Sequence, residues 1–160
     1  MFGGPPKPRL AIFGAGAVGQ ALRRQFELLA FRVEHYDCRE SLAAPEVTIL
    51  AEDELVELAG CLEADDFALI VSPTHELDYR LARAVLGREP MRYCGMMGSR
   101  KKRAGFEARF AEDGLTPEQI GRLSCPVGIA TLHSSAPEVI AVAAAAEILQ
   151  VLEASAAAAS

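Results

Sequence analysis

Short apolar runs alternate with longer amphipathic stretches along this sequence. The clearest run, residues 67–71, contains no polar side chain, as expected of a strand buried on both faces of a sheet. Apolar runs of this length, bounded by glycine, proline or polar residues, favour strands over helices. We predict five strands, over residues 9–13, 31–36, 47–50, 67–71 and 91–97.

The stretches between these runs have helical spacing. The first presents a single apolar stripe, made by Val18, Leu22, Phe26 and Leu29. Thr116, followed by proline and then by Gln119, has the features of a helix start. Ser135 and Glu138 repeat that pattern before an alanine-rich segment. We predict helices near 18–29, 76–86 and 101–112, another from about 117, and a last one over 139–152.

Strand–helix alternation of this kind predicts an α/β fold with a Rossmann-like, doubly wound parallel sheet. The 160 residues fit a single domain. We place that domain at 9–153, after a glycine- and proline-rich lead-in at 1–8 and before a low-complexity tail at 154–160. We expect the tail to fray. The last helix has no charged residue between Val139 and Ala146, so we expect it to pack against the sheet.

Composition and charge narrow the class of protein. Hydrophobic residues make up 51% of the chain and charged residues 24%, which is a globular balance. The net charge of −6 argues against nucleic acid or anionic membranes as partners, because both favour a basic surface. No apolar run reaches the roughly 18 residues of a membrane span, and no signal peptide opens the sequence. We therefore expect a cytoplasmic protein.

Four cysteines lie at positions 38, 61, 94 and 125. They form no CxxC pair and no zinc-ligand spacing, so we predict neither a metal site nor a disulfide framework. Single buried thiols are the simplest interpretation, although Cys38 and Cys125 both fall beside functional-looking segments.

A GxGxxG motif joins the first predicted strand to the first predicted helix. Gly14 allows a tight turn, Gly16 lets the backbone approach a pyrophosphate, and Gly19 lets the helix lie close to the strand. The helix start at Ala17 and Val18 then offers free N–H groups and a positive dipole end to phosphate. We predict a phosphate- or nucleotide-bearing ligand here; the alternative is a Rossmann domain whose nucleotide site is vestigial.

Asp37 ends the second strand, 18 residues after Gly19. A carboxylate at this place accepts hydrogen bonds from ribose hydroxyls and repels a 2′-phosphate. The spacing therefore favours NAD over NADP, although the nearby Arg39 weakens that preference.

Two further loops are expected at the same crevice, beyond the carboxyl ends of the strands. The fourth strand is followed by Thr74 and His75, where the histidine either contacts the ligand or faces solvent with Thr74 as a helix cap. The fifth is followed by Gly98, Ser99 and a basic run that begins at Arg100. We predict an anion site there, with two of the four basic residues pointing inward. The alternative is a solvated basic face or a patch for an acidic partner protein.

Three motifs after the fifth strand resemble the C-terminal Rossmann domain of the XdhC/CoxI family, the xanthine dehydrogenase accessory proteins. They are Gly-Ser-Arg-Lys-Lys-Arg at 98–103, Cys-Pro-Val-Gly-Ile at 125–129 and Pro-Glu-Val-Ile-Ala-Val at 137–142, leading to Ala-Glu-Ile at 146–148. The pair at 74–75 fits as well. The resemblance extends over about residues 8–150, and the order of the later motifs makes it specific.

This resemblance implies a chaperone of the molybdenum cofactor, a molybdopterin that carries a phosphate or a dinucleotide. Such proteins work with a cysteine desulfurase and deliver the cofactor to a xanthine dehydrogenase-type apoenzyme. Carried over by position, the ligand crevice would be lined by Gly14, Gly16, Gly19, Thr74, His75, Ser99 and Arg100. Cys125 would lie on a nearby loop, either approaching the metal or simply packed.

The sequence departs from the family pattern at three places. It begins at the Rossmann strand, whereas the family usually carries an N-terminal domain with its own cysteine motif. We therefore expect either a single-domain relative or a partner domain located elsewhere. Glu76 stands where the family has aspartate, and Leu132-His133 stands where it has Ile-Gly.

Two alternatives use the same GxGxxG motif. One is a small NAD(P)-dependent oxidoreductase, although no Tyr-x-x-x-Lys pair is present and little sequence remains for a substrate domain. The other is a sensor module that binds NAD(P) or ATP and signals to a partner. The alanine-rich last helix can bury against its own sheet or across a homodimer.

Overall fold

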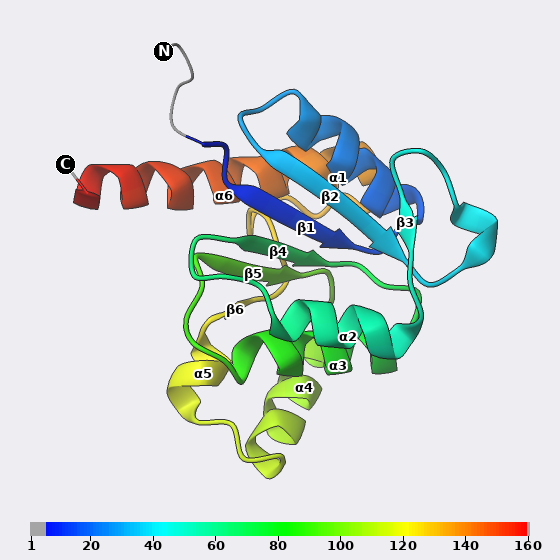
Figure 1. Ribbon diagram of the computed structural model, residues 1–160. Coiled ribbons are helices and arrows are strands. Elements are labelled where there is room, and N and C mark those ends of the chain that lie inside the picture. The colour runs from blue at the N-terminus through cyan, green and yellow to red at the C-terminus, as the bar shows by residue number, and fades with distance from the viewer. Residues whose placement is uncertain (1–5, 160) are drawn as a thin grey trace.

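The computed structural model describes residues 6–159 (Figure 1). Its centre is a six-stranded sheet in which every neighbouring pair is parallel. The strands lie in the order β3-β2-β1-β4-β5-β6, with the reversal of winding between β1 and β4. Their bounds are β1 Arg9–Phe13, β2 Arg32–Asp37, β3 Thr48–Ile49, β4 Phe67–Ile70, β5 Tyr93–Met96 and β6 Leu123–Ser124. This is the order of dinucleotide-binding doubly wound sheets, and the predicted fold class is confirmed.

Helices cover both faces of the sheet (Figure 1). The first and last helices lie on one face, and α2, α3 and α4 pack on the other. A short α5 and the 3₁₀ helix η1 lie in connections. The bounds are α1 Ala17–Glu27, η1 Glu40–Leu42, α2 Glu52–Gly60, α3 His75–Leu86, α4 Arg100–Glu112, α5 Pro117–Gly121 and α6 Pro137–Ala159.

The central strand β1 shows why its sequence is an unbroken apolar run. Leu10 and Ile12 point into the core formed with α1 and α6, while Ala11 and Phe13 point into the core formed with α2, α3 and α4. All four side chains are fully buried. A strand covered on both faces leaves no position at which a polar residue is solvated.

The last helix differs from its prediction at both ends. It begins at Pro137 instead of 139, and no cap from Ser135 forms. It also continues to Ala159, whereas we expected a frayed tail from residue 154. Alanine is the strongest helix former, so a run of alanines extends a helix whose first half is already held by packing.

Residues Pro137–Ala158 of α6 are long and apolar enough to cross a membrane by length and composition alone, with a mean hydropathy of 1.7. The first half of α6 is instead part of the domain core. Ala141, Ala144 and Ile148 are buried there against α1 and the sheet, which confirms the predicted packing.

Candidate functional site

The loops after four parallel strands meet along the carboxyl edge of the sheet, which we define as the edge where those strands end. Backbone hydrogen bonds join each loop to the strand beside it. They run from the N–H of Gly14 to Tyr36, of Val71 to Phe13, of Met97 to Ile70 and of Val127 to Met96, with N···O distances of 2.8, 2.9, 3.2 and 3.1 Å. The loops after β1, β4, β5 and β6 therefore form one continuous rim.

The three motif glycines have different reasons to be glycine. Gly14 has φ +130°, and a Cβ there would collide with the Val71 carbonyl. A Cβ on Gly19 would collide with the carbonyl of Gly14, so both glycines are required by the fold. Gly16 has φ −71°, and the nearest atom to a Cβ there is Arg39 Nη2 at 3.8 Å. The fold itself leaves space at Gly16.

The start of α1 is not capped by a side chain. Gly16 is the N-cap residue and contributes no side-chain cap, and no acidic residue lies in the first turn. Ala17 is exposed and Val18 is half-buried. The first N–H groups of a helix have no partner within it, and the dipole there is positive. By contrast, α3 and α4 are capped by the hydroxyls of Thr74 and Ser99.

Asp37 lies at the end of β2, as predicted, and its carboxylate holds the glycine loop. Oδ2 accepts the N–H of Ala15 at 2.7 Å and Nη2 of Arg39 at 2.8 Å. Oδ1 accepts the N–H and Nε of Arg39 at 2.8 and 2.9 Å. These four bonds use the usual acceptor capacity of a carboxylate. Burial alone would raise the pKa of Asp37, but the bonds from Arg39 and Ala15 outweigh it and lower the pKa to about 2.

The group at this end of the crevice that reaches solvent is therefore Arg39. Its side chain is 40% exposed, whereas that of Asp37 is fully buried. A ribose diol could bond to Asp37 only by displacing Arg39, and the guanidinium itself is suited to an anionic group.

His35, one residue before Tyr36 on β2, is a support that sequence reasoning missed. Its Nε2 lies 2.6 Å from the Gly14 carbonyl oxygen, and Arg23 Nη1 lies 3.2 Å from its Nδ1. Because arginine can only donate, Nδ1 accepts and Nε2–H donates. Burial is the main cause that lowers the pKa of His35. A histidine within a strand has no local pattern that shows it holds a loop 21 residues earlier in the chain.

The loop after β4 places Thr74 and His75 at the start of α3. Thr74 Oγ1 accepts the N–H of Leu77 at 3.1 Å, which is the capping role we considered. His75 is exposed at the first position of the helix. Asp78, which the sequence analysis did not single out, accepts both the N–H and the hydroxyl of Ser72, at 2.9 and 2.6 Å.

The basic run after β5 divides into two outward and two inward residues. Arg100 and Lys101 are exposed. Lys102 Nζ lies 2.6 Å from Asp78 Oδ2 and 2.9 Å from the Met97 carbonyl, and both side chains of this ion pair are nearly buried. Arg103 donates to the Cys125 carbonyl at 2.7 Å. Two residues point inward, as predicted, and Arg100 is not one of them. Within residues 6–159 its side chain has no hydrogen-bond or ion-pair partner.

A cavity of about 580 Å³ opens beside Gly98 and Ser99. We call it the β5–α6 cavity; its walls come from the end of β5, the loop 126–135 and the first turns of α6. Its larger lining side chains include those of Met97, Val127, Ile129, Leu132, His133 and Ile140. The sequence analysis placed Gly98 and Ser99 at the ligand site and Cys125 on a nearby loop, but it did not predict that residues 126–135 line a cavity.

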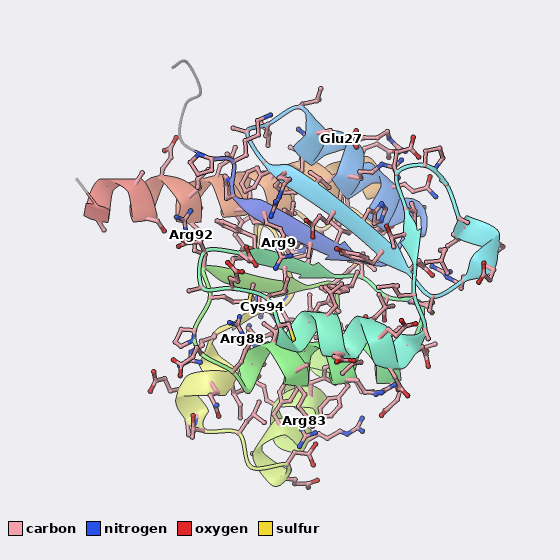
Figure 2. The ribbon with its side chains drawn as sticks, viewed as in Figure 1. Arg9, Glu27, Arg83, Arg88, Arg92 and Cys94 are labelled. Carbon is pink, nitrogen blue, oxygen red and sulfur yellow. The ribbon has the colours of Figure 1, made fainter. Side chains whose placement is uncertain are left out.

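Cys125 lies under this loop and is packed. Cys125 is 3% exposed, and burial raises the pKa of its thiol. Cys94 on β5 is also buried, in the core between the sheet and α3 (Figure 2). Of the two roles considered for Cys125, the structure has the packed one.

A second cavity, of about 760 Å³, lies on the outer side of α3, α4 and α5, where Arg83 and Arg88 are labelled in Figure 2. Its charged groups largely pair with one another. Arg109 donates to both oxygens of Glu76, and Arg83 lies 3.6 Å from Asp113. This cavity is away from the carboxyl edge and lacks the uncapped helix start, so the candidate site is the rim at the carboxyl edge, together with the β5–α6 cavity.

The sheet order, the glycine turn and the open start of α1 define a doubly wound α/β domain of the dinucleotide-binding class. Comparison with known families gives the particular family. A model of the XdhC Rossmann domain matches residues 10–148, and the chain belongs to that family.

Two relatives extend this comparison. The uncharacterized protein YqeB of Escherichia coli K12 is 34% identical over 152 residues, covering 91% of this chain and 27% of YqeB. A crystal structure described as a xanthine dehydrogenase from Bacillus halodurans matches with a TM-score of 0.77 and 26% identity, covering 93% of this chain and 44% of that one. The chain thus spans less than half the length of either relative.

Proposed function

We propose that this domain binds the molybdenum cofactor as cargo and serves as an accessory domain in the maturation of a xanthine dehydrogenase-type molybdoenzyme. Membership in the XdhC Rossmann family and the likeness to the Bacillus halodurans structure support this role. In this proposal a cysteine desulfurase supplies sulfur to the cargo, and the apoenzyme receives it. The domain acts in the cytoplasm.

The observation that carries the proposal is the space at Gly16. The fold accommodates a side chain there, yet the residue is glycine at the uncapped start of α1. A glycine that packing does not demand is explained if a ligand must approach the backbone closely. A phosphate of the cofactor would meet free N–H groups and a positive dipole end at that point.

The remaining residues suit the organic part of the cargo. Arg39 at one end of the crevice and Arg100 at the start of α4 are cations that a phosphate can reach from solvent. Within residues 6–159 no group of three or more His, Cys, Asp or Glu side chains could hold a metal ion. In this proposal the protein groups address the phosphate and pterin, and the metal is carried by the cofactor itself.

A nicotinamide dinucleotide is the competing ligand, because it needs the same glycine turn. The engagement of Asp37 with Arg39 removes the free carboxylate that a ribose diol normally meets, so NADPH would be favoured over NADH. A sensor or oxidoreductase role would follow from tight binding of such a nucleotide in preference to the pterin.

The test is delivery of the cargo. The purified chain is incubated with released molybdenum cofactor, desalted, and mixed with molybdenum-free xanthine dehydrogenase-type apoenzyme, a cysteine desulfurase and cysteine. We expect xanthine oxidation to appear faster than with free cofactor at the same molybdenum concentration, and NADH or NADPH to slow it only at high excess. A chain that adds nothing to the rate, or that is emptied by micromolar nucleotide, would contradict the proposal.

A further inference from the structure

The exposed apolar residues of this domain gather at one cavity. Five large hydrophobic residues are exposed in the described part of the chain, and three of them, Met97, Ile129 and Leu132, line the β5–α6 cavity. They are 37%, 43% and 48% exposed. Single exposed apolar side chains need no explanation, but three that converge on one concavity mark a place where a ligand contributes the missing apolar contacts.

The cavity lies on the same rim as the glycine turn. The strand order places β4 alone between β1, which carries Gly14, and β5, which carries Met97. The rim bonds from Val71 to Phe13 and from Met97 to Ile70 hold these loops side by side. Two strand spacings separate them, roughly 10 Å. Asp37 and Arg39 lie on the opposite side of the glycine turn, at the end of β2.

This order places three different features along the rim. Cationic Arg39 lies at one end, the open helix start lies in the middle, and the apolar cavity lies at the other end. A ligand that carries a phosphate between two larger groups would place one group near Arg39, the phosphate at the start of α1 and the other group in the cavity. The group that enters the cavity must be apolar on its faces, because Ile129 and Leu132 offer no hydrogen bonds.

The edge of that group meets polar atoms. Ser99, His133, Ser134 and Ser135 line the same cavity. The hydroxyl of Ser134 accepts the N–H of Ala136 at 3.1 Å and that of Ser99 accepts the N–H of Lys102 at 3.0 Å, so both hydroxyl hydrogens remain to be donated. Apolar walls with a few hydroxyl donors suit a planar heteroaromatic ring whose nitrogen and oxygen acceptors lie at its edge.

We propose that the β5–α6 cavity is the ring subsite of this domain and takes the planar heteroaromatic ring of the ligand whose phosphate lies at the start of α1. The assignment of the phosphate rests on the proposed function, whereas the cavity itself does not. Its volume of about 580 Å³ falls within the usual range for small-molecule sites, about 300–1,000 Å³. A pterin and a nicotinamide share the required chemistry.

The test uses two half-ligands on ¹⁵N-labelled protein. 6-Hydroxymethylpterin supplies a ring without phosphate, and ADP-ribose supplies a pyrophosphate without that ring. We expect the pterin to shift backbone amide resonances of residues 97–99 and 127–143, and ADP-ribose to shift those of residues 14–19. Nicotinamide riboside in place of the pterin shows which ring the cavity prefers. Pterin shifts that fall outside 97–99 and 127–143 would overturn the proposal.

A matched pair of variants distinguishes pterin binding in the cavity from binding elsewhere on the domain. Leu132→Asp puts a charge on the cavity wall. Leu28→Asp puts one on the other exposed leucine, which is 81% exposed and is the C-cap residue of α1. We expect Leu132→Asp to weaken pterin binding at least tenfold and Leu28→Asp to change it less than twofold, with ADP-ribose binding unchanged in both. Equal pterin affinity in the two variants would contradict the ring subsite.

The outcomes separate this proposal from the proposed function. If the pterin maps to the cavity and the chain does not deliver cofactor, the ring subsite stands and the accessory role fails. If the chain delivers cofactor but the pterin shifts amide resonances outside 97–99 and 127–143, the accessory role stands and the ring subsite is wrong.

Discussion

Asp37 is the residue on which the shape of the glycine loop depends most directly. Its bond to the Ala15 N–H is buried, so a substitution that removes the acceptor leaves that donor without a partner. Asparagine keeps one accepting oxygen, but its NH₂ group can only donate, so it cannot serve both the Ala15 N–H and the three Arg39 donors. We predict that Asp37→Asn lowers the free energy of unfolding at pH 7 by about 2 kcal/mol, because a buried donor left unsatisfied costs about 1–3 kcal/mol. Urea denaturation measures the change, and Asp53→Asn, at an exposed ion pair, is the control.

Acid gives a second readout of the same residue. The pKa of Asp37 is about 2 in the folded protein against an ordinary value of 3.8. The unfolded chain therefore takes up the proton first, and the contribution of the carboxylate is present above about pH 4 and lost as the pH falls towards 2. Asp37→Asn should lose less stability than the wild type over that interval. An identical acid profile for the two proteins would contradict this role.

Arg100 is the residue whose predicted role the fold leaves open, since its side chain is exposed and unpaired within residues 6–159. We predict that Arg100→Ala weakens binding of the molybdenum cofactor at least tenfold, about 1.4 kcal/mol, because a phosphate would lose a charge-assisted hydrogen bond. A titration followed by pterin fluorescence measures this, with the exposed neighbour Lys101→Ala as control. Equal affinity for both variants would place the anion elsewhere.

For single residues, the sequence predicts where a side chain lies in the fold better than it predicts which groups that side chain bonds to. Asp37 is recognisable because a strand end after GxGxxG is where such an acid occurs. Its partner Arg39 is also local, two residues away. The roles of His35, Asp78 and Lys102 are not recognisable, because each depends on a group from another element that only the folded chain brings near.

Between elements, the ion pair of Lys102 and Asp78 joins α4 to α3 beneath the crevice. Lys102 also lies over the ring of Phe106, with Nζ 5.4 Å from its centroid. We predict that Lys102→Met costs about 3 kcal/mol of unfolding free energy, because loss of one partner leaves a buried charge uncompensated. Ser72 continues to donate to Asp78, which keeps the cost at the lower end of the range of about 3–5 kcal/mol.

Lys101→Met is the matched control for that pair, one residue away and exposed. Its effect is expected to stay within about 0.5 kcal/mol, as is usual for surface sites. If the two substitutions destabilise the domain equally in thermal or urea unfolding, the ion pair contributes nothing specific.

The elements themselves were predictable where they are long or fully apolar. The five predicted strands are present, with β3 shortened to Thr48–Ile49 and β5 to Tyr93–Met96. β6 was missed because two residues carry no periodicity, and only its pairing with Cys94 and Gly95 makes it a strand. The loop 126–135 was missed as a cavity wall for the same reason, since irregular backbone has no repeat that shows which side chains face inward.

For the molecule as a whole, the strand order explains why segments distant in sequence meet at one edge of the sheet. Residues near 16, 39, 74, 99 and 132 come together because parallel strands end at one edge and the winding reverses between β1 and β4. The alternation of strands and helices predicted this edge, and the later motifs predicted the family. The division of the crevice into cationic, helix-start and apolar parts required the packed structure.

In the proposed function, the open space at Gly16 takes the phosphate of a pterin cofactor. The most direct measurement compares retention of released molybdenum cofactor after gel filtration, read by pterin fluorescence after oxidation, in the wild type, Gly16→Val and Gly121→Val. A Cβ at Gly121 meets nothing within 4 Å, and one at Gly16 meets only Arg39, so both variants should fold. We predict that the wild type and Gly121→Val retain pterin and that Gly16→Val retains at most a tenth as much. Full retention by Gly16→Val, or none by the wild type, would contradict the account.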